Sequence, residues 1–134
     1  MKVPTEIRDL VLSFIVDEEN VVEIYTQFSG IKWYIIHEKT QHFNWRKVSM
    51  CQTLSESFIR SFQDQLDWGL VSEYQKLSER SMRNFKDRLI WILIPMHQDL
   101  SEDFIREFSH KVNWYSVSRY QNFQSPLFAN LKIK

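Results

Sequence analysis

The stretch LSESFIRSFQDQLDWGLVSEYQK, residues 54–76, is followed directly by two altered copies of itself. The copies are LSERSMRNFKDRLIWILIPMHQD at residues 77–99 and LSEDFIREFSHKVNWYSVSRYQN at residues 100–122, so the period is 23 residues. A fixed period of this size is typical of repeat proteins, in which a unit that cannot bury its apolar face alone stacks on its neighbours. The repeat therefore predicts a stack of similar units.

Each unit is predicted to be a hairpin of two helices. In the last copy Ser101 is placed to cap a first helix of about twelve residues, and Asn113 is placed to cap a shorter second helix. The first helix is expected to bury four apolar side chains on one face: Phe104, Ile105, Phe108 and Val112. The second is expected to bury Trp114, Val117 and Tyr120 and to expose Ser116, Ser118 and Arg119.

The remaining residues fit an all-α fold, a single domain of stacked helical hairpins with atypical ends. Residues 1–30 are predicted to form an N-terminal capping hairpin or degenerate repeat, with a helix over Glu6–Val16 and a short second helix ending at Ser29-Gly30. Residues 31–53 are a divergent repeat, in which Ile31–His37 has strand propensity although the repeat frame favours helix. Residues 123–134 are expected to be a C-terminal cap.

Composition excludes several classes of protein. The 17 acidic and 17 basic residues balance, so no overall field favours nucleic acid or an anionic membrane. The two glycines and three prolines are too few to punctuate an all-β domain. Cys51 is the only cysteine, which suits a reducing compartment, and it is expected to be a small buried hydrophobe. The pattern indicates neither a signal peptide nor a membrane span.

No catalytic or cofactor motif stands out, and we expect neither an enzyme nor a metal site. The four histidines are scattered without metal-ligand spacing: His37, His42, His97 and His110. The sequence contains no Gly-rich phosphate loop and no nucleophile elbow. One tryptophan recurs in every unit, at Trp45, Trp68, Trp91 and Trp114. Packing between units favours a core role for this series, and stacking on nucleobases is the alternative.

The last copy resembles tandem repeats of the type LSEDFIREF…KVNW…IS.YQ, which occur in proteins of large DNA viruses and some phages. The resemblance covers residues 54–122 well and residues 31–53 loosely. It implies an interaction scaffold of viral origin, and small viral proteins of this kind are often inhibitors directed at the host. VPTEIRDLVLSFI at Val3–Ile15 resembles the start of an F-box, a helical adaptor segment of ubiquitin ligases; an ordinary amphipathic capping helix is the alternative.

The copy at residues 77–99 departs most from the others and carries the candidate partner-binding residues. Its second helix has an apolar strip where the next copy is largely polar, comprising Ile92, Leu93, Pro95 and Met96. Its first helix is predicted to have a locally basic face, with Arg80, Arg83, Lys86 and Arg88. The strip is either an exposed interface or a surface buried where the stack turns.

These features lead us to expect a non-enzymatic protein-interaction module in the host cytoplasm. Its most concrete form is a phage or viral inhibitor of a host defence, similar to an anti-CRISPR protein, that binds a nuclease or ribonucleoprotein. Two alternatives remain open: an RNA-binding repeat protein that uses the local basic face, and a viral F-box-like adaptor. Homo-oligomerisation through the apolar strip also remains open.

Overall fold

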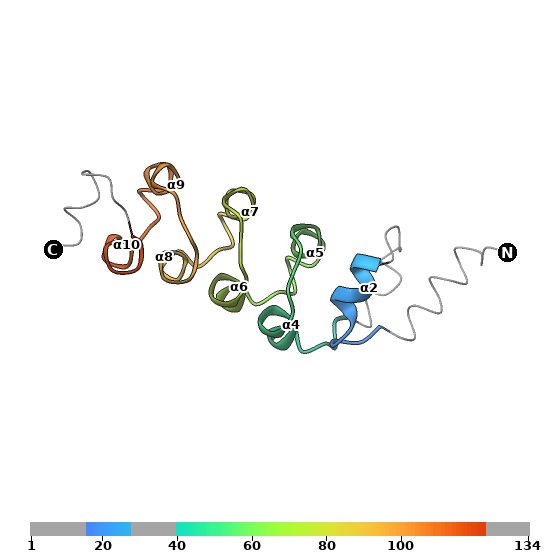
Figure 1. The fold of residues 1–134 in the computed structure, drawn as a ribbon. Helices are drawn as coiled ribbons and strands as arrows, with labels where there is room; N and C mark the ends of the chain where they lie inside the picture. Colours follow the sequence, from blue (N-terminus) through green and yellow to red (C-terminus); the bar gives the residue numbers. More distant parts are fainter. Residues whose placement is uncertain (1–15, 28–39, 123–134) are drawn as a thin grey trace. The chain divides into compact units, whose positions relative to one another are not determined.

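A computed structural model describes residues 16–27 and 40–122, and the regular elements in this part of the chain are all helices, joined by turns (Figure 1). The helices are α2 Val21–Gln27, α4 Trp45–Cys51, α5 Glu56–Ser61, α6 Trp68–Tyr74, α7 Glu79–Asn84, α8 Ile94–His97, α9 Glu102–Glu107 and α10 Trp114–Tyr120. The predicted all-α class is confirmed for these residues. The predicted helix over Glu6–Val16, the run Ile31–His37 and the cap at 123–134 lie outside the described residues, apart from Val16.

The chain divides into two compact units, Met1–Asp67 and Trp68–Lys134. The boundary falls inside the first clear copy of the repeat, between α5 and α6. In the second unit α6, α8 and α10 follow one another in one row, and α7 and α9 form another (Figure 1). Helix α8 contacts both α6 and α10.

A serine begins the first helix of each clear copy. The Oγ atoms of Ser55, Ser78 and Ser101 accept hydrogen bonds from the backbone N–H groups three residues later, at 3.2, 3.0 and 3.1 Å. All three caps have extended backbone, with ψ of 156–158°. The predicted serine cap is therefore confirmed, and it occurs in all three copies.

These first helices are only six residues long, so the predicted length of about twelve was wrong. Each ends at a phenylalanine with φ between −116° and −106° and ψ between 21° and 28°: Phe62, Phe85 and Phe108. Beyond it the chain continues in a turn that contains a tight i to i+3 bond, such as Lys111 N–H to the Phe108 carbonyl at 2.9 Å. The apolar residues keep their helical spacing through this turn, so the sequence pattern predicts helix where the chain forms a turn.

Asparagine caps two of the second helices. The Oδ1 of Asn44 accepts from the Lys47 N–H at 3.2 Å, and that of Asn113 accepts from the Ser116 N–H at 2.9 Å, which confirms the predicted cap at Asn113. In the copy at residues 77–99 the chain instead forms a turn at residues 91–93, and α8 is only four residues long. Pro95 explains the short helix, because proline has no N–H to donate to the carbonyl of residue 91.

The rotation of α10 differs from the prediction. Ser116, Val117 and Gln121 are buried, whereas Trp114 is 39% exposed and Tyr120 is 48% exposed. Val117 was predicted correctly, but Ser116, Trp114 and Tyr120 were assigned to the wrong faces. The buried face of α10 is the one next to Gln121, whose side chain binds the preceding copy.

Buried glutamine side chains join successive units in the second half of the chain. Gln98 Nε2 donates to the carbonyls of Ser72 and Gln75 at 3.0 and 2.7 Å, and its Oε1 accepts from the Leu77 N–H at 3.0 Å. The same three bonds recur 23 residues later. Gln121 Nε2 donates to the carbonyls of Pro95 and Gln98, both at 2.7 Å, and its Oε1 accepts from the Leu100 N–H at 3.2 Å.

The recurring tryptophan packs against the phenylalanines of the following copy. The ring centroid of Trp91 lies 6.2 Å from Phe104 and 4.9 Å from Phe108, with interplanar angles of 22° and 27°. The ring centroid of Trp68 lies 5.5 Å from that of Phe85, which belongs to the following copy. In the first unit Trp45 lies 6.4 Å from Phe58 and 5.2 Å from Phe62. This is the inter-unit packing that the recurrence of tryptophan predicts.

Candidate protein-interaction surface

The apolar strip of residues 92–96 is divided between surface and core. Ile92 is 55% exposed and Met96 is 37% exposed, whereas Ile94 and Pro95 are buried and Leu93 is half-buried. Neither of the two expectations for the strip, interface or burial, therefore describes all of it. Ile92 and Met96 are the residues of the strip that a partner can reach.

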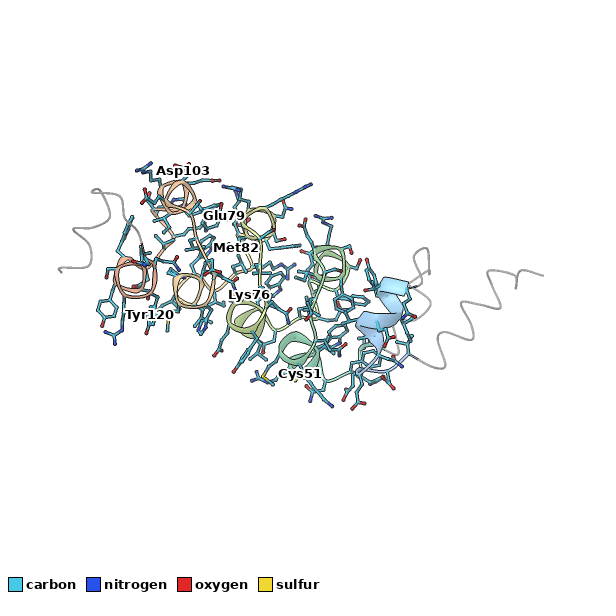
Figure 2. All side chains as sticks on the ribbon, viewed as in Figure 1. Cys51, Lys76, Glu79, Met82, Asp103 and Tyr120 are labelled. Atoms are coloured by element: carbon cyan, nitrogen blue, oxygen red, sulfur yellow. The ribbon has the colours of Figure 1, made fainter. Side chains whose placement is uncertain are left out.

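The exposed apolar surface continues onto α10. Tyr115, which stands 23 residues after Ile92, is 69% exposed, and Tyr120 is 48% exposed. Figure 2 shows Tyr120 on the outside of α10. Because α8 and α10 are in contact, these exposed side chains belong to two neighbouring repeat units. We call the five residues Ile92, Met96, Tyr115, Arg119 and Tyr120 the outer face.

Arg119 supplies the charge of the outer face. Its Nη1 lies 3.5 Å from the Tyr115 hydroxyl, at the outer limit of a hydrogen bond, and its guanidinium carbon lies 5.9 Å from the centroid of the Tyr120 ring. Hydrogen bonding to Tyr120, together with the electrostatic influence of Tyr115, raises the pKa of Arg119 above its usual value. Neither α8 nor α10 contains an acidic residue. The outer face therefore combines large apolar side chains with one positive charge.

Sequence reasoning found only part of this surface. It selected Ile92 and Met96 because they interrupt the polar pattern of the other copies. It missed Tyr120, which was assigned to the core, and it did not select Tyr115 or Arg119. The available signal was that Tyr115 occupies the same repeat position as Ile92, so two successive units place large apolar side chains at one outer position.

The four basic residues predicted on the first helix of this copy lie apart from the strip. Arg80 and Arg83 are on α7, and Lys86 and Arg88 are in the turn that follows it; all four are exposed. Helix α7 belongs to the row opposite α8 (Figure 1), so the structure does not gather the basic residues and the strip on one helix row.

Arg83 is engaged by its own chain. Its Nε lies 2.9 Å from Glu107 Oε2, its Nη2 lies 3.9 Å from Glu79 Oε2, and its guanidinium lies 5.3 Å from the Phe104 ring centroid. The two carboxylates offset the charge of Arg83 and reduce its contribution to a phosphate-binding path. The basic face is therefore weaker than its sequence indicates.

Cys51 is exposed, so the prediction that it is buried was wrong. The inward residues of α4 are Val48 and Ser49, and Cys51 lies at the last position of the helix, outside that face. Its sulfur is visible at the edge of α4 in Figure 2.

Across residues 16–27 and 40–122, His, Cys, Asp and Glu side chains do not gather in groups of three or more that could hold a metal ion. Over that range no helix has both the length and the apolar character needed to cross a membrane.

No family model matches this chain, and comparisons with curated proteins and with solved structures gave no significant match. The resemblance to viral tandem repeats and the likeness of residues 3–15 to an F-box therefore stay predictions from the sequence.

Proposed function

We propose that the protein is a non-enzymatic interaction module and that the outer face docks a protein partner. The observation that carries this proposal is the exposure of Ile92 in the turn before α8, of Met96 on α8, and of Tyr115 and Tyr120 on the adjacent α10. Tyrosine, methionine and arginine are enriched at protein interfaces, and tyrosine and arginine often supply most of the binding energy. The residue types of the outer face therefore suit a protein better than a phosphate backbone.

The chemistry of the outer face defines the kind of partner. A complementary surface has an apolar centre for Ile92 and Tyr115 and a carboxylate opposite Arg119. A symmetric dimer through this face would bring two copies of Arg119 to one interface without an acidic residue from α8 or α10, which disfavours self-association. A host protein with an acidic, partly apolar surface fits better.

The most concrete form of the proposal is a phage or viral inhibitor that binds a nuclease or ribonucleoprotein of a host defence system. Its support is the resemblance of the third copy to viral tandem repeats, together with a surface suited to binding a protein. In this form the module acts by occupying its partner's surface, and it acts inside the host cell.

A paired substitution tests the use of the outer face. Ile92→Asp with Tyr115→Asp places two carboxylates on it, and we expect loss of the partner that the unchanged protein captures from host lysate, measured by quantitative mass spectrometry. Helical circular dichroism should stay unchanged because both side chains are exposed. Met50→Asp is the matched control, since Met50 is 40% exposed on α4 and lies outside the outer face. Equal capture by the paired variant and the unchanged protein would refute the proposal.

The two alternatives make different predictions in the same experiment. RNA binding through Arg80 and Lys86 predicts capture that falls steeply with salt and is lost in Lys86→Glu. An F-box-like adaptor predicts capture of a ubiquitin-ligase subunit that is lost when residues 1–16 are deleted. Capture that survives both changes but is lost in the outer-face variant favours the protein-interaction module.

A further inference from the structure

The second helix of each clear copy ends in a residue with an aromatic ring. Tyr74 is the last residue of α6, His97 of α8 and Tyr120 of α10, so the rings recur at the period of 23 residues. Tyr74 is 52% exposed, Tyr120 is 48% exposed and His97 is half-buried. We call these three residues the ring row. Each of the three copies thus places a ring with a polar tip at one equivalent position.

The glutamine after each ring holds the ends of the three helices side by side. Gln98 Nε2 donates to the Gln75 carbonyl and Gln121 Nε2 donates to the Gln98 carbonyl, both at 2.7 Å. All three glutamines are buried. Because successive residues of a helix are about 100° apart around its axis, the ring before each buried glutamine lies on the same side of its helix in all three copies. Helices α6, α8 and α10, which follow one another in contact, therefore carry the ring row along one edge (Figure 1).

The residues before the rings give the ring row a charge at each end. Glu73 precedes the first ring, Met96 the second and Arg119 the third. The guanidinium carbon of Arg119 lies 5.9 Å from the centroid of the Tyr120 ring. The row thus runs from a carboxylate through an apolar side chain to a guanidinium. An elongated ligand with a basic residue at one end and an acidic residue at the other is complementary to it.

Acidic side chains beside the ring row disfavour a nucleic acid as its ligand. Glu73 stands next to the first ring, and the side chain of Asp99, two residues after His97, is fully exposed. The Asp99 carboxylate also lies 3.9 Å from Lys76 Nζ, so it offsets that positive charge. A phosphate backbone requires cations that are not offset in this way along its path. A peptide is therefore the ligand that suits these charges.

The separation of packed helices matches the turn of a polyproline II segment. Packed helices lie about 8–10 Å apart, and a polyproline II helix advances about 9 Å in each turn of three residues. A ring on each of three adjacent helices can therefore meet successive turns of such a segment, which aromatic side chains commonly recognise. We propose that the ring row binds an extended proline-rich segment of a partner protein, with a basic residue of the segment near Glu73 and an acidic residue near Arg119.

The chemistry of such a segment suits the tips of the rings as well as their faces. A polyproline II backbone has no internal hydrogen bonds, so its carbonyls are open to the hydroxyl groups of Tyr74 and Tyr120. Its pyrrolidine rings are apolar and pack against the aromatic rings. Because the segment is already extended before it binds, it loses little conformational entropy. The inference names the partner chemistry of the proposed function and rests on it, since Met96, Arg119 and Tyr120 also belong to the outer face.

Binding of a synthetic peptide to the full-length protein tests the inference. The probe is one lysine, five prolines and one glutamate with blocked ends, which places its charges about 19 Å apart, or two helix separations. By isothermal titration calorimetry we expect a Kd below about 1 mM. Tyr74→Ala should weaken binding at least about fivefold, whereas Tyr74→Phe keeps the ring and most of the affinity. Ile90→Ala is the matched control, since Ile90 is 43% exposed and lies outside the ring row.

Two changes of peptide test the shape and the charge of the ligand separately. Five glycines in place of the prolines keep the charges but lose the polyproline II shape, and this peptide should bind at least about fivefold more weakly. A proline peptide with lysine at both ends should bind more weakly than the probe to the unchanged protein. Arg119→Glu should reverse that preference, because it exchanges the guanidinium at one end of the row for a carboxylate.

Four results would overturn the inference: a Kd for the probe above about 1 mM, equal affinity in Tyr74→Ala, equal affinity for the glycine peptide, or tighter binding of oligouridine that depends on Tyr74. The proposed function is tested separately by Ile92→Asp with Tyr115→Asp in host lysate. Lost capture in that variant without binding of the probe removes this inference and leaves the proposed function standing. Binding of the probe with unchanged capture refutes the outer face as the docking surface.

Discussion

Replacing Gln98 with methionine tests whether the buried glutamine is a main source of stability between α6 and α8. Gln98 is 3% exposed and makes three hydrogen bonds to backbone groups, two in the preceding copy at Ser72 and Gln75 and one at Leu77, where its own copy begins. Methionine has nearly the same length and is readily buried, but it cannot donate to the carbonyls of Ser72 and Gln75 or accept strongly from the Leu77 N–H. The substitution therefore removes three bonds while it preserves most of the volume.

The expected cost follows from these bonds. An intramolecular hydrogen bond contributes about 1 kcal/mol on average, so the three bonds of Gln98 correspond to about 3 kcal/mol. The apolar surface of methionine offsets part of this loss, whereas leaving two carbonyls and one N–H unpaired in a buried site adds to it. We expect the free energy of unfolding to fall by about 3 kcal/mol, a large fraction of the 5–15 kcal/mol typical of a folded domain.

Urea unfolding followed by far-ultraviolet circular dichroism measures this change. Gln41→Met is the control, because Gln41 is exposed and its replacement should change the free energy by less than about 0.5 kcal/mol. Gln121→Met repeats the experiment one unit later, where the same three bonds recur. If Gln98→Met is no more destabilising than Gln41→Met, the bonds are not a source of stability and the reasoning is wrong.

Three further predictions concern single contacts. Ser101→Ala removes the cap to the Phe104 N–H and should cost about 1 kcal/mol in urea unfolding, with Ser101→Gly costing less. Trp91→Ala removes the indole packed on Phe104 and should cost about 3–5 kcal/mol in the same assay; a cost below 1 kcal/mol would show that the ring contacts are dispensable. The hydrogen bond to Glu19 raises the pKa of Lys47 above its ordinary 10.5, so its stabilising contribution is present below pH 10.5 and is lost as pH rises through the higher folded value. Glu19→Gln should lower the Lys47 pKa in a nuclear magnetic resonance titration, and an unchanged titration would contradict this assignment.

The parts of the fold that depend on local chemistry could be predicted from the sequence. Ser101 and Asn113 stand at cap positions and act as caps, because their side chains satisfy N–H groups close by in the chain. Helix length could not be predicted in this way. The helix ends at Phe108 through backbone angles, while the apolar pattern runs on to Val112.

The rotation of α10 shows why part of the candidate surface was missed. Its apolar residues Trp114, Val117 and Tyr120 recur at helical spacing and indicate one face, yet the buried face passes through Val117 and Gln121. A pattern of apolar and polar residues assigns glutamine to solvent. Only the contact with the preceding copy shows that this amide is paired with backbone and buried.

The bonds of Gln98 and Gln121 also bear on how such a chain can change over time. Both amides bind main-chain carbonyl and N–H groups, which nearly every amino acid offers in the same form. A gene that gains another copy of the 23-residue segment therefore gains a joint that fits at once, without matching mutations in its neighbour. Side chains on the solvent side then vary independently of that joint, so copy number and recognition surface can evolve separately.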